Sequence, residues 1–321
     1  MYGHYRGGVE SLWIESGDVR LHALAAGQGP AVLMVHGFPG LSDSRRHQMP
    51  MLAAAGYRAV AGDTRGYGGS DRPAEGYDAE TVEADLRAVL DALDVDSAVV
   101  VGQDFGSRYA WNLARHHPER VRAVVGTVPF ADLPAETAPT QMWRHLASEH
   151  FLHLHYFQEP GRAEADLGGD HVAEFLSRLM WALSGEGTYF SVFGHPGEAT
   201  YLEALPEAPP LPWSWLSAAE FEHIVAEFRR GGVGREYAGG LGSYRSADAD
   251  WAYEDRWRGQ PITVPAMLLI GENDPVRKFT QVDRELFTDL TEVVVPGAGH
   301  HVQQERPEQV NEALLDFLGR A

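Results

Sequence analysis

The chain has 321 residues, 44% of them hydrophobic, and a formal net charge of −20 at pH 7. That length can bury one large core with an appended lid, and the acidic balance disfavours nucleic acid and anionic membranes as partners. The absence of cysteine excludes disulfides, a cysteine nucleophile and thiolate metal sites. No apolar run approaches the roughly 20 residues of a membrane span. The first residues lack an apolar stretch behind a basic start, so we expect no signal peptide and a soluble cytoplasmic protein.

An alternation of short apolar runs and helical patterns follows a hairpin that we expect at residues 10–26. Buried strands are expected at 31–35, 57–61, 97–101, 121–125, 266–270 and 292–295. Helices are expected at 79–93, 107–117 and 307–319. Because strand and helix alternate, the connections are right-handed crossovers and the sheet is mostly parallel, with helices on both faces. The predicted fold class is α/β.

Residues 130–260 break this alternation. They are rich in aromatic residues and proline, they contain no buried-strand run, and they favour helices at 171–184 and 217–230. We interpret them as a helical cap, or lid, over the C-terminal edge of the sheet, where α/β folds place their sites. Residues 1–129 and 261–321 then form the core.

The segment V-V-V-G-Q-D-F-G (99–106) runs from a predicted strand directly into a helix. Gly102 and Gly106 flank Asp104 at minus two and plus two, which is the pattern of a nucleophile elbow with a strained central residue. A carboxylate at that position suits attack on an sp³ carbon that carries a leaving group, giving an ester intermediate. No G-x-S-x-G occurs, which disfavours a serine esterase. The alternative is a glycine-rich turn in which Asp104 only caps the helix.

Three further loops supply partners for Asp104. H-G-F-P-G (36–40) follows the first parallel strand, so the backbone N–H groups of Phe38 and Phe105 are candidate oxyanion donors. Asp274 follows the penultimate strand in G-E-N-D, and His300 follows the last strand in G-A-G-H-H. This order of nucleophile, acid and base is typical of the α/β-hydrolase fold. His300 would activate a water molecule, and Asp274 would orient its imidazole.

Two neighbours compete for these roles. His301 is adjacent to His300, although His300 matches the G-x-G-H pattern better. Asp132 follows the fourth parallel strand and is the alternative to Asp274 as the acid of the triad.

With these motifs the sequence resembles the soluble epoxide hydrolase family over nearly its whole length. The resemblance rests on H-G-F-P (36–39), D-T-R-G-Y-G-G-S-D (63–71), G-Q-D-F-G (102–106), Y-F-Q-E-P-G (156–161), G-E-N-D (271–274) and G-A-G-H-H-V-Q-Q-E-R-P-E (297–308). It implies a small epoxide as substrate. Asp104 opens the epoxide, and water activated by His300 hydrolyses the resulting ester to a diol. It implies no cofactor, and we expect a monomer or homodimer.

The family also uses two lid tyrosines that donate hydrogen bonds to the epoxide oxygen. One of them matches Tyr244, but His153 stands at the position of the other, as in some bacterial members with a His/Tyr pair. An imidazole N–H can donate whether it is neutral or charged. Tyr156 is the alternative donor, and packing without a catalytic role is the alternative for both residues. We also expect Trp181 and Trp215 to line the substrate pocket.

The sequence leaves three other functions open. A metal site at His150, His153 and His155 has no partner carboxylates, so we expect no metal. Haloalkane dehalogenases have Trp where this chain has Phe105, and haloacetate dehalogenases have Arg there and at the position of Arg108. A dehalogenase therefore remains the alternative. A non-enzymatic receptor on this scaffold would usually have lost a triad residue.

Overall fold

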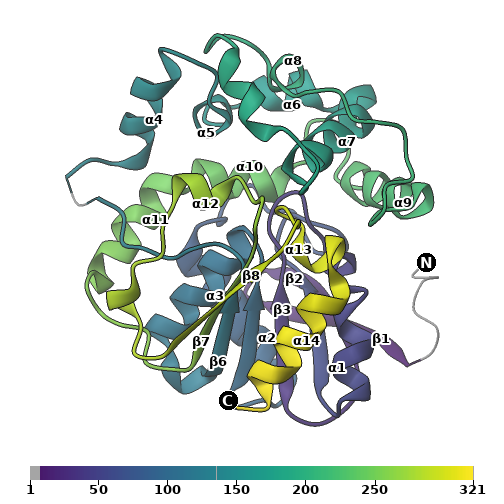
Figure 1. The fold of residues 1–321 in the computed structure, drawn as a ribbon, viewed down its shortest axis with the longest axis vertical. Coiled ribbons are helices and arrows are strands. Elements are labelled where there is room, and N and C mark those ends of the chain that lie inside the picture. Colours follow the sequence, from purple (N-terminus) through teal and green to yellow (C-terminus); the bar gives the residue numbers. More distant parts are fainter. Residues whose placement is uncertain (1–7, 135, 321) are drawn as a thin grey trace.

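The computed structural model describes residues 8–134 and 136–320, drawn in Figure 1. Within these residues one sheet of eight strands has the order β1-β2-β4-β3-β5-β6-β7-β8. The pairs β1–β2 and β2–β4 are antiparallel, and every other pair is parallel. The strands are β1 Val9–Ser16, β2 Val19–Ala26, β3 Ala31–Val35, β4 Arg58–Asp63, β5 Ala98–Gly102, β6 Val121–Gly126, β7 Ala266–Gly271 and β8 Leu290–Val295. The predicted mostly parallel α/β sheet is confirmed.

Helices cover both faces of this sheet, which explains why β3 and β5 are buried at every position. One apolar cluster joins the sheet to α2 and α3, and another joins the opposite face to α1 and α14. The helices that follow the core strands are α1 Gln48–Ala54, α2 Ala79–Ala92, α3 Phe105–His116, α12 Val276–Phe279, α13 Val302–Glu305 and α14 Pro307–Leu318.

The remaining helices lie in the insertion between β6 and β7. They are α4 Pro139–Ala147, α5 His153–Tyr156, α6 Arg162–Leu167, α7 Val172–Leu183, α8 Tyr201–Ala204, α9 Ala218–Arg229, α10 Ala238–Arg245 and α11 Ala247–Glu254. A reciprocal capping box begins α9, since the Ser217 hydroxyl accepts from the Glu220 N–H and the Glu220 carboxylate accepts from the Ser217 N–H.

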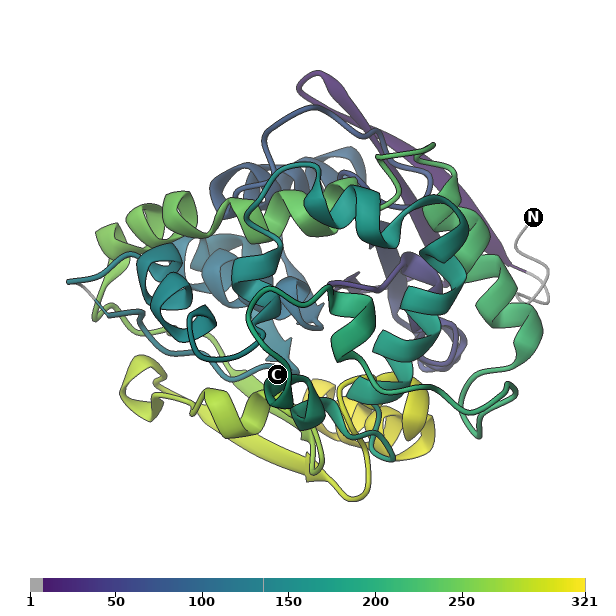
Figure 2. The same ribbon diagram turned by 90° about the horizontal axis from the view of Figure 1, so that it is seen from above.

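Helices α4 to α10 form a covering layer above the carboxyl ends of the strands (Figures 1 and 2). This layer has its own apolar cluster, to which Phe38 and Tyr67 of the sheet's loops contribute. Helix α11 differs, because Tyr253 packs in the cluster of the sheet and Asp250 accepts from the Ala79 N–H at the start of α2. The division into a core and a cap at residues 130–260 stays a prediction.

Candidate active site

The turn between β5 and α3 holds Asp104 in a strained conformation, with φ 55° and ψ −123°. Such a backbone costs about 1–3 kcal/mol in a residue other than glycine and persists only where its surroundings impose it. Here the turn is too tight for side chains on either side. A β-carbon at Gly102 would clash with the carbonyl of Gly106, and one at Gly106 would clash with the carbonyl of Val35. These contacts are the physical reason for the glycine spacing.

Three loops at one edge of the sheet bring Asp104, Asp274 and His300 together. His300 Nδ1 lies 3.0 Å from Asp274 Oδ2, and His300 Nε2 lies 3.4 Å from Asp104 Oδ2. Asp274 is buried, and its Oδ1 accepts from the Val276 N–H at 2.9 Å. Burial lowers the pKa of His300, but the two carboxylates outweigh it and hold that pKa well above 6.5. His300 is therefore an imidazolium while both carboxylates are charged.

Backbone N–H groups support the carboxylate of Asp104. The Phe38 N–H donates to Asp104 Oδ1 at 2.8 Å, and the Phe105 N–H also bonds to it. Burial raises the pKa of Asp104, but His300 and these two donors lower it below its ordinary value. Asp104 is thus an ionised carboxylate with a side chain that is 20% exposed, and the ionised form is the state that a nucleophile requires.

The competing residues point elsewhere. The ring of His301 stacks on Trp215 with centroids 5.3 Å apart, and burial together with the charge of His300 lowers its pKa to about 3. Asp132 forms an ion pair with Arg115 at 2.8 Å and accepts from the Gly259 N–H. Neither of the two contacts Asp104 in the structure.

A cavity of about 80 Å³ lies between Asp104 and the covering layer. Its polar residues are Asp104, His153, Tyr189, Tyr201, Tyr244 and His300. Leu179, Leu183 and Val276 belong to its apolar lining. The structure therefore places the two predicted lid donors in the lining of the cavity that Asp104 also lines.

The rings of His153 and Tyr244 pack edge-on, with centroids 5.7 Å apart. Burial and the charge of Asp104 raise the pKa of Tyr244 well above 10, so its hydroxyl keeps its proton. Burial lowers the pKa of His153 to about 4, so its imidazole is neutral at pH 7. Within the described chain neither the Tyr244 hydroxyl nor His153 Nε2 has a hydrogen-bond partner, and neither atom is sealed off in protein.

Sequence reasoning missed two tyrosines in this cavity. The Tyr189 hydroxyl lies 2.7 Å from His153 Nδ1, and the Tyr201 hydroxyl lies 2.9 Å from that of Tyr189. Tyr189 opens a short 3₁₀ helix, Tyr189–Gly194, and Tyr201 begins α8. The only signal in the sequence was the high aromatic content of residues 130–260, which does not say which ring meets His153.

Three predicted substrate contacts do not line this cavity. The Tyr156 hydroxyl donates to Asp166 at 2.8 Å, and Tyr156 is not among the residues that line the cavity. Trp181 packs against Trp213 with ring centroids 5.2 Å apart, and Trp215 covers His301 as described above. These side chains support the walls of the covering layer without reaching Asp104.

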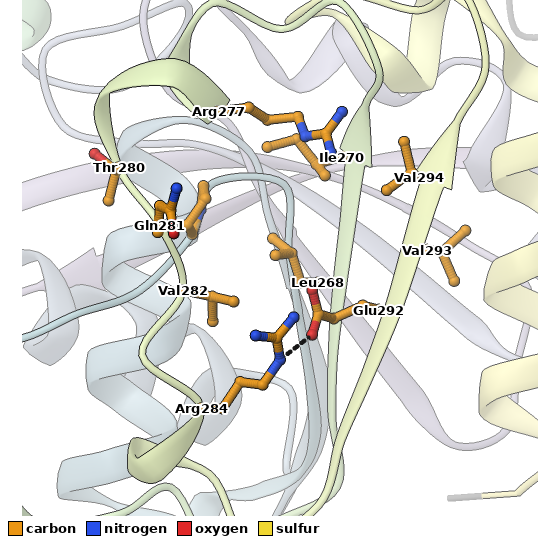
Figure 3. Close-up of a pocket in the computed structure, with 11 residues that line it drawn as sticks. Leu268, Ile270, Arg277, Thr280, Gln281, Val282, Arg284, Glu292, Val293 and Val294 are labelled. Carbon is orange, nitrogen blue, oxygen red and sulfur yellow. Dashed lines mark hydrogen bonds and ion pairs between the residues drawn. The ribbon is translucent and has the colours of Figure 1, made fainter.

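A more open cavity of about 180 Å³ lies against β7 and the edge strand β8 (Figure 3). Figure 3 shows the ion pair of Arg284 with Glu292 there, and Arg277 in the same lining donates to the Glu272 carbonyl at 3.0 Å. None of the residues that the structure describes around it is a predicted catalytic residue. The described residues also contain no group of three or more His, Asp or Glu side chains arranged to hold a metal ion. The cavity at Asp104 is therefore the candidate active site.

Comparison with known proteins identifies the family. Residues 30–159 match the family model described as alpha/beta hydrolase fold. Epoxide hydrolase A of Mycobacterium tuberculosis is 40% identical to this chain over 95% of the chain and 96% of its own length. The chain belongs to the epoxide hydrolase family. In the described part of the chain, no helix is both long and apolar enough to cross a bilayer.

Solved epoxide hydrolases have the same architecture. The crystal structure of Epoxide Hydrolase A from Mycobacterium thermoresistibile has a TM-score of 0.89 and 40% identity, covering 97% of this chain and 98% of its own. An epoxide hydrolase from an endophytic Streptomyces has a TM-score of 0.91 and 35% identity, covering 98% and 96%. The covering layer of this chain is therefore part of the architecture that it shares with these hydrolases.

Proposed function

We propose that this chain hydrolyses a small epoxide to a vicinal diol through a covalent ester on Asp104. The observation that carries the proposal is the position of Tyr244 and His153. Their unpaired polar atoms face the cavity opposite an ionised Asp104, where they can donate to the epoxide oxygen. The names of the relatives agree with this substrate class.

In the first step a carboxylate oxygen of Asp104 attacks a ring carbon, and the C–O bond on the opposite side breaks. Its electron pair passes to the epoxide oxygen, which becomes an alkoxide. A bare alkoxide is a poor leaving group, so hydrogen bonds from Tyr244 and His153 lower the barrier as the charge develops. The burial that keeps Tyr244 protonated also makes its hydrogen bond stronger than it would be in water.

In the second step water attacks the ester carbonyl. Ester formation removes the negative charge of Asp104, which is one of the two carboxylates that raise the pKa of His300. His300 can then give up its proton through water to the alkoxide, which becomes a hydroxyl, and act as the base that deprotonates the attacking water, with Asp274 holding its Nδ1 side. The tetrahedral intermediate collapses by cleavage of the ester C–O bond, and the leaving oxygen takes the remaining hydroxyl proton of the intermediate. The diol is released, and the Asp104 carboxylate and the His300 imidazolium are restored. The N–H groups of Phe38 and Phe105 already bond the carboxylate, so they are placed to stabilise the tetrahedral oxyanion.

Dehalogenation is the second candidate, and two contacts weigh against it. Arg108 is held by Glu254 at 2.6 Å and lies 3.4 Å from Asp250, so its charge is used inside the protein. Phe105 has no polar group with which to bind a halide or a carboxylate. A receptor role is disfavoured because Asp104, His300 and Asp274 are assembled in hydrogen-bonding order.

The test is a panel of epoxides and haloacids assayed with the wild type and with Asp104→Asn. We expect diol from at least one epoxide, no halide release, and no activity in the variant over short incubations, before the amide can deamidate. A single turnover in ¹⁸O-water should place the label in Asp104. Label confined to the diol would refute the ester mechanism, and halide release without diol would favour the dehalogenase.

Two properties stay predictions beside this function. The acidic charge favours solubility, and we expect the protein in the cytoplasm as a monomer or a homodimer. Sedimentation and cell fractionation measure them directly.

A further inference from the structure

We propose that Tyr189, supported by Tyr201, is a positioning residue that fixes the tautomer of His153, so that its Nε2–H points into the cavity as the second donor to the epoxide oxygen. The proposal rests on the function proposed above. It adds two residues to the site: Tyr189, which contacts His153, and Tyr201, which contacts Tyr189.

The geometry places a short chain of polar groups behind His153. The hydroxyl of Tyr189 is 2.7 Å from His153 Nδ1, and the hydroxyl of Tyr201 is 2.9 Å from that of Tyr189. Tyr189 and Tyr201 are 5% and 1% exposed, so water does not compete freely for these bonds. Tyr201 also stacks on the His153 ring with an interplanar angle of 16°.

The direction of the two hydrogen bonds follows from counting their protons and from asking which group would be left as an unpaired donor. Each tyrosine has one proton, and burial raises the pKa of both phenols, so both keep it. If Tyr201 donates to Tyr189 and Tyr189 donates to His153 Nδ1, both hydroxyl protons have an acceptor. Either direction leaves one of the three protons without a protein acceptor. In the forward direction this is His153 Nε2–H, which reaches the cavity; in the reverse direction it is the hydroxyl proton of Tyr201, a residue that is only 1% exposed, and an unpaired buried donor costs about 1–3 kcal/mol. The forward direction is therefore favoured.

The forward direction leaves His153 with a lone pair on Nδ1 and a proton on Nε2. Burial lowers the pKa of His153 to about 4, so the neutral ring has only that one proton at pH 7. Nε2 has no partner in the described chain and reaches the cavity. The single available N–H thus points toward the substrate.

This support is required because His153 replaces a tyrosine. A phenol has its proton on the one atom that can donate, whereas a neutral imidazole can place its proton on either nitrogen. The wrong tautomer would turn a lone pair toward the developing alkoxide and repel it. Tyr189 removes that choice. Its own hydrogen bond to Nδ1 strengthens as negative charge builds on the epoxide oxygen that accepts from Nε2–H.

The kinetic test compares Tyr189→Phe with the wild type. We expect the rate of ester formation to fall by about tenfold with little change in KM, because the interaction strengthens only in the transition state. Tyr237→Phe is the matched control, since it removes a buried hydroxyl bond to the Leu167 carbonyl in the same apolar cluster. The control should leave the rate within about twofold. In a His153→Tyr background, Tyr189→Phe should no longer lower the rate. An equal loss in both backgrounds would overturn the proposal.

A spectroscopic test does not depend on turnover. In protein with ¹⁵N-labelled histidine, the His153 signals are assigned by their loss in His153→Tyr. We expect a protonated Nε2 and an unprotonated Nδ1 in the wild type, and a mixture of tautomers in Tyr189→Phe. A proton on Nδ1 in the wild type would overturn the proposal even if the enzyme forms diol. Conversely, if no epoxide of the panel gave a diol, the proposed function would be overturned, and the tautomer assignment would still stand.

Discussion

Replacing Tyr244 by phenylalanine tests the site most sharply, because it removes a hydroxyl that has no partner in the described chain. The ring itself stays in place, since it packs on Phe105 and Phe157 with centroids 4.8 Å away from each. Losing one donor to a developing oxyanion costs about 10²–10³ in rate. The second donor, His153, remains in the variant, so we expect ester formation to fall by about 10²-fold. Stability should change by less than about 0.5 kcal/mol.

The assay is rapid quench of a single turnover, with the ester on Asp104 detected by mass spectrometry, together with urea unfolding of both proteins. Tyr156→Phe is the matched control, because its hydroxyl bonds to Asp166 outside the cavity. The control should cost about 1 kcal/mol of stability and leave the rate within about twofold. The reasoning is refuted if Tyr244→Phe forms the ester within about threefold of the wild-type rate, or if Tyr156→Phe is the slower variant.

Three further outcomes are expected. His300→Gln should form the ester and fail to hydrolyse it, so the mass of the protein should rise by that of the substrate; a protein that stays unmodified and turns over normally would exclude His300 as the base. The fold raises the pKa of His300 above its ordinary value of 6.5. The stability that His300 contributes is therefore complete below pH 6.5 and is lost as the pH rises through the pKa of the folded state. The melting temperature of the wild type should therefore fall on the alkaline side, and this fall should be absent in His300→Gln. A β-carbon at Gly37 would clash with the Asp104 carboxylate, so Gly37→Ala should lower kcat by about 10²-fold in a steady-state assay, whereas near-normal kcat would show that the loop can move aside.

The positions of the three loops that carry Asp104, Asp274 and His300 were predictable, because each depends on a short sequence pattern beside a strand. Buried strands appear as short β-branched runs, and the carboxyl ends of parallel strands meet at one edge of a sheet. Asp104 and Asp274 follow buried strands and His300 follows the last strand, so their order along the chain implies their proximity. The expectation of a buried strand at 292–295 was wrong in its burial, because β8 is an edge strand that is fully buried only at Val295. The glycines around Asp104 are also a local signal, since the turn has no room for their side chains.

The covering layer was less predictable in its packing than in its helices. The helices expected at 171–184 and 217–230 exist as α7 and α9, but which of their side chains face the cavity depends on distant partners. Trp181 and Trp215 were expected in the pocket because they are large aromatic residues of the insertion. Trp181 instead packs against Trp213, and Trp215 packs against His301. Helix α11 lies within the insertion in sequence but packs on α2. The direction of such a side chain is set by the surface that buries most of it, and no periodicity in the sequence indicates which surface that is.

The sequence by itself determined the family and the α/β sheet, and it predicted the nucleophile, acid and base in chain order, because each lies in a contiguous motif directly after a strand. Only the tertiary structure places the hydroxyls of Tyr189 and Tyr201 behind His153, the predicted second oxygen donor. Tyr189 is 36 residues from His153, and their contact exists because a 3₁₀ helix and α8 pack against α5. A tautomer depends on hydrogen-bond geometry of a few tenths of an ångström, which folding creates and residue order alone does not reveal.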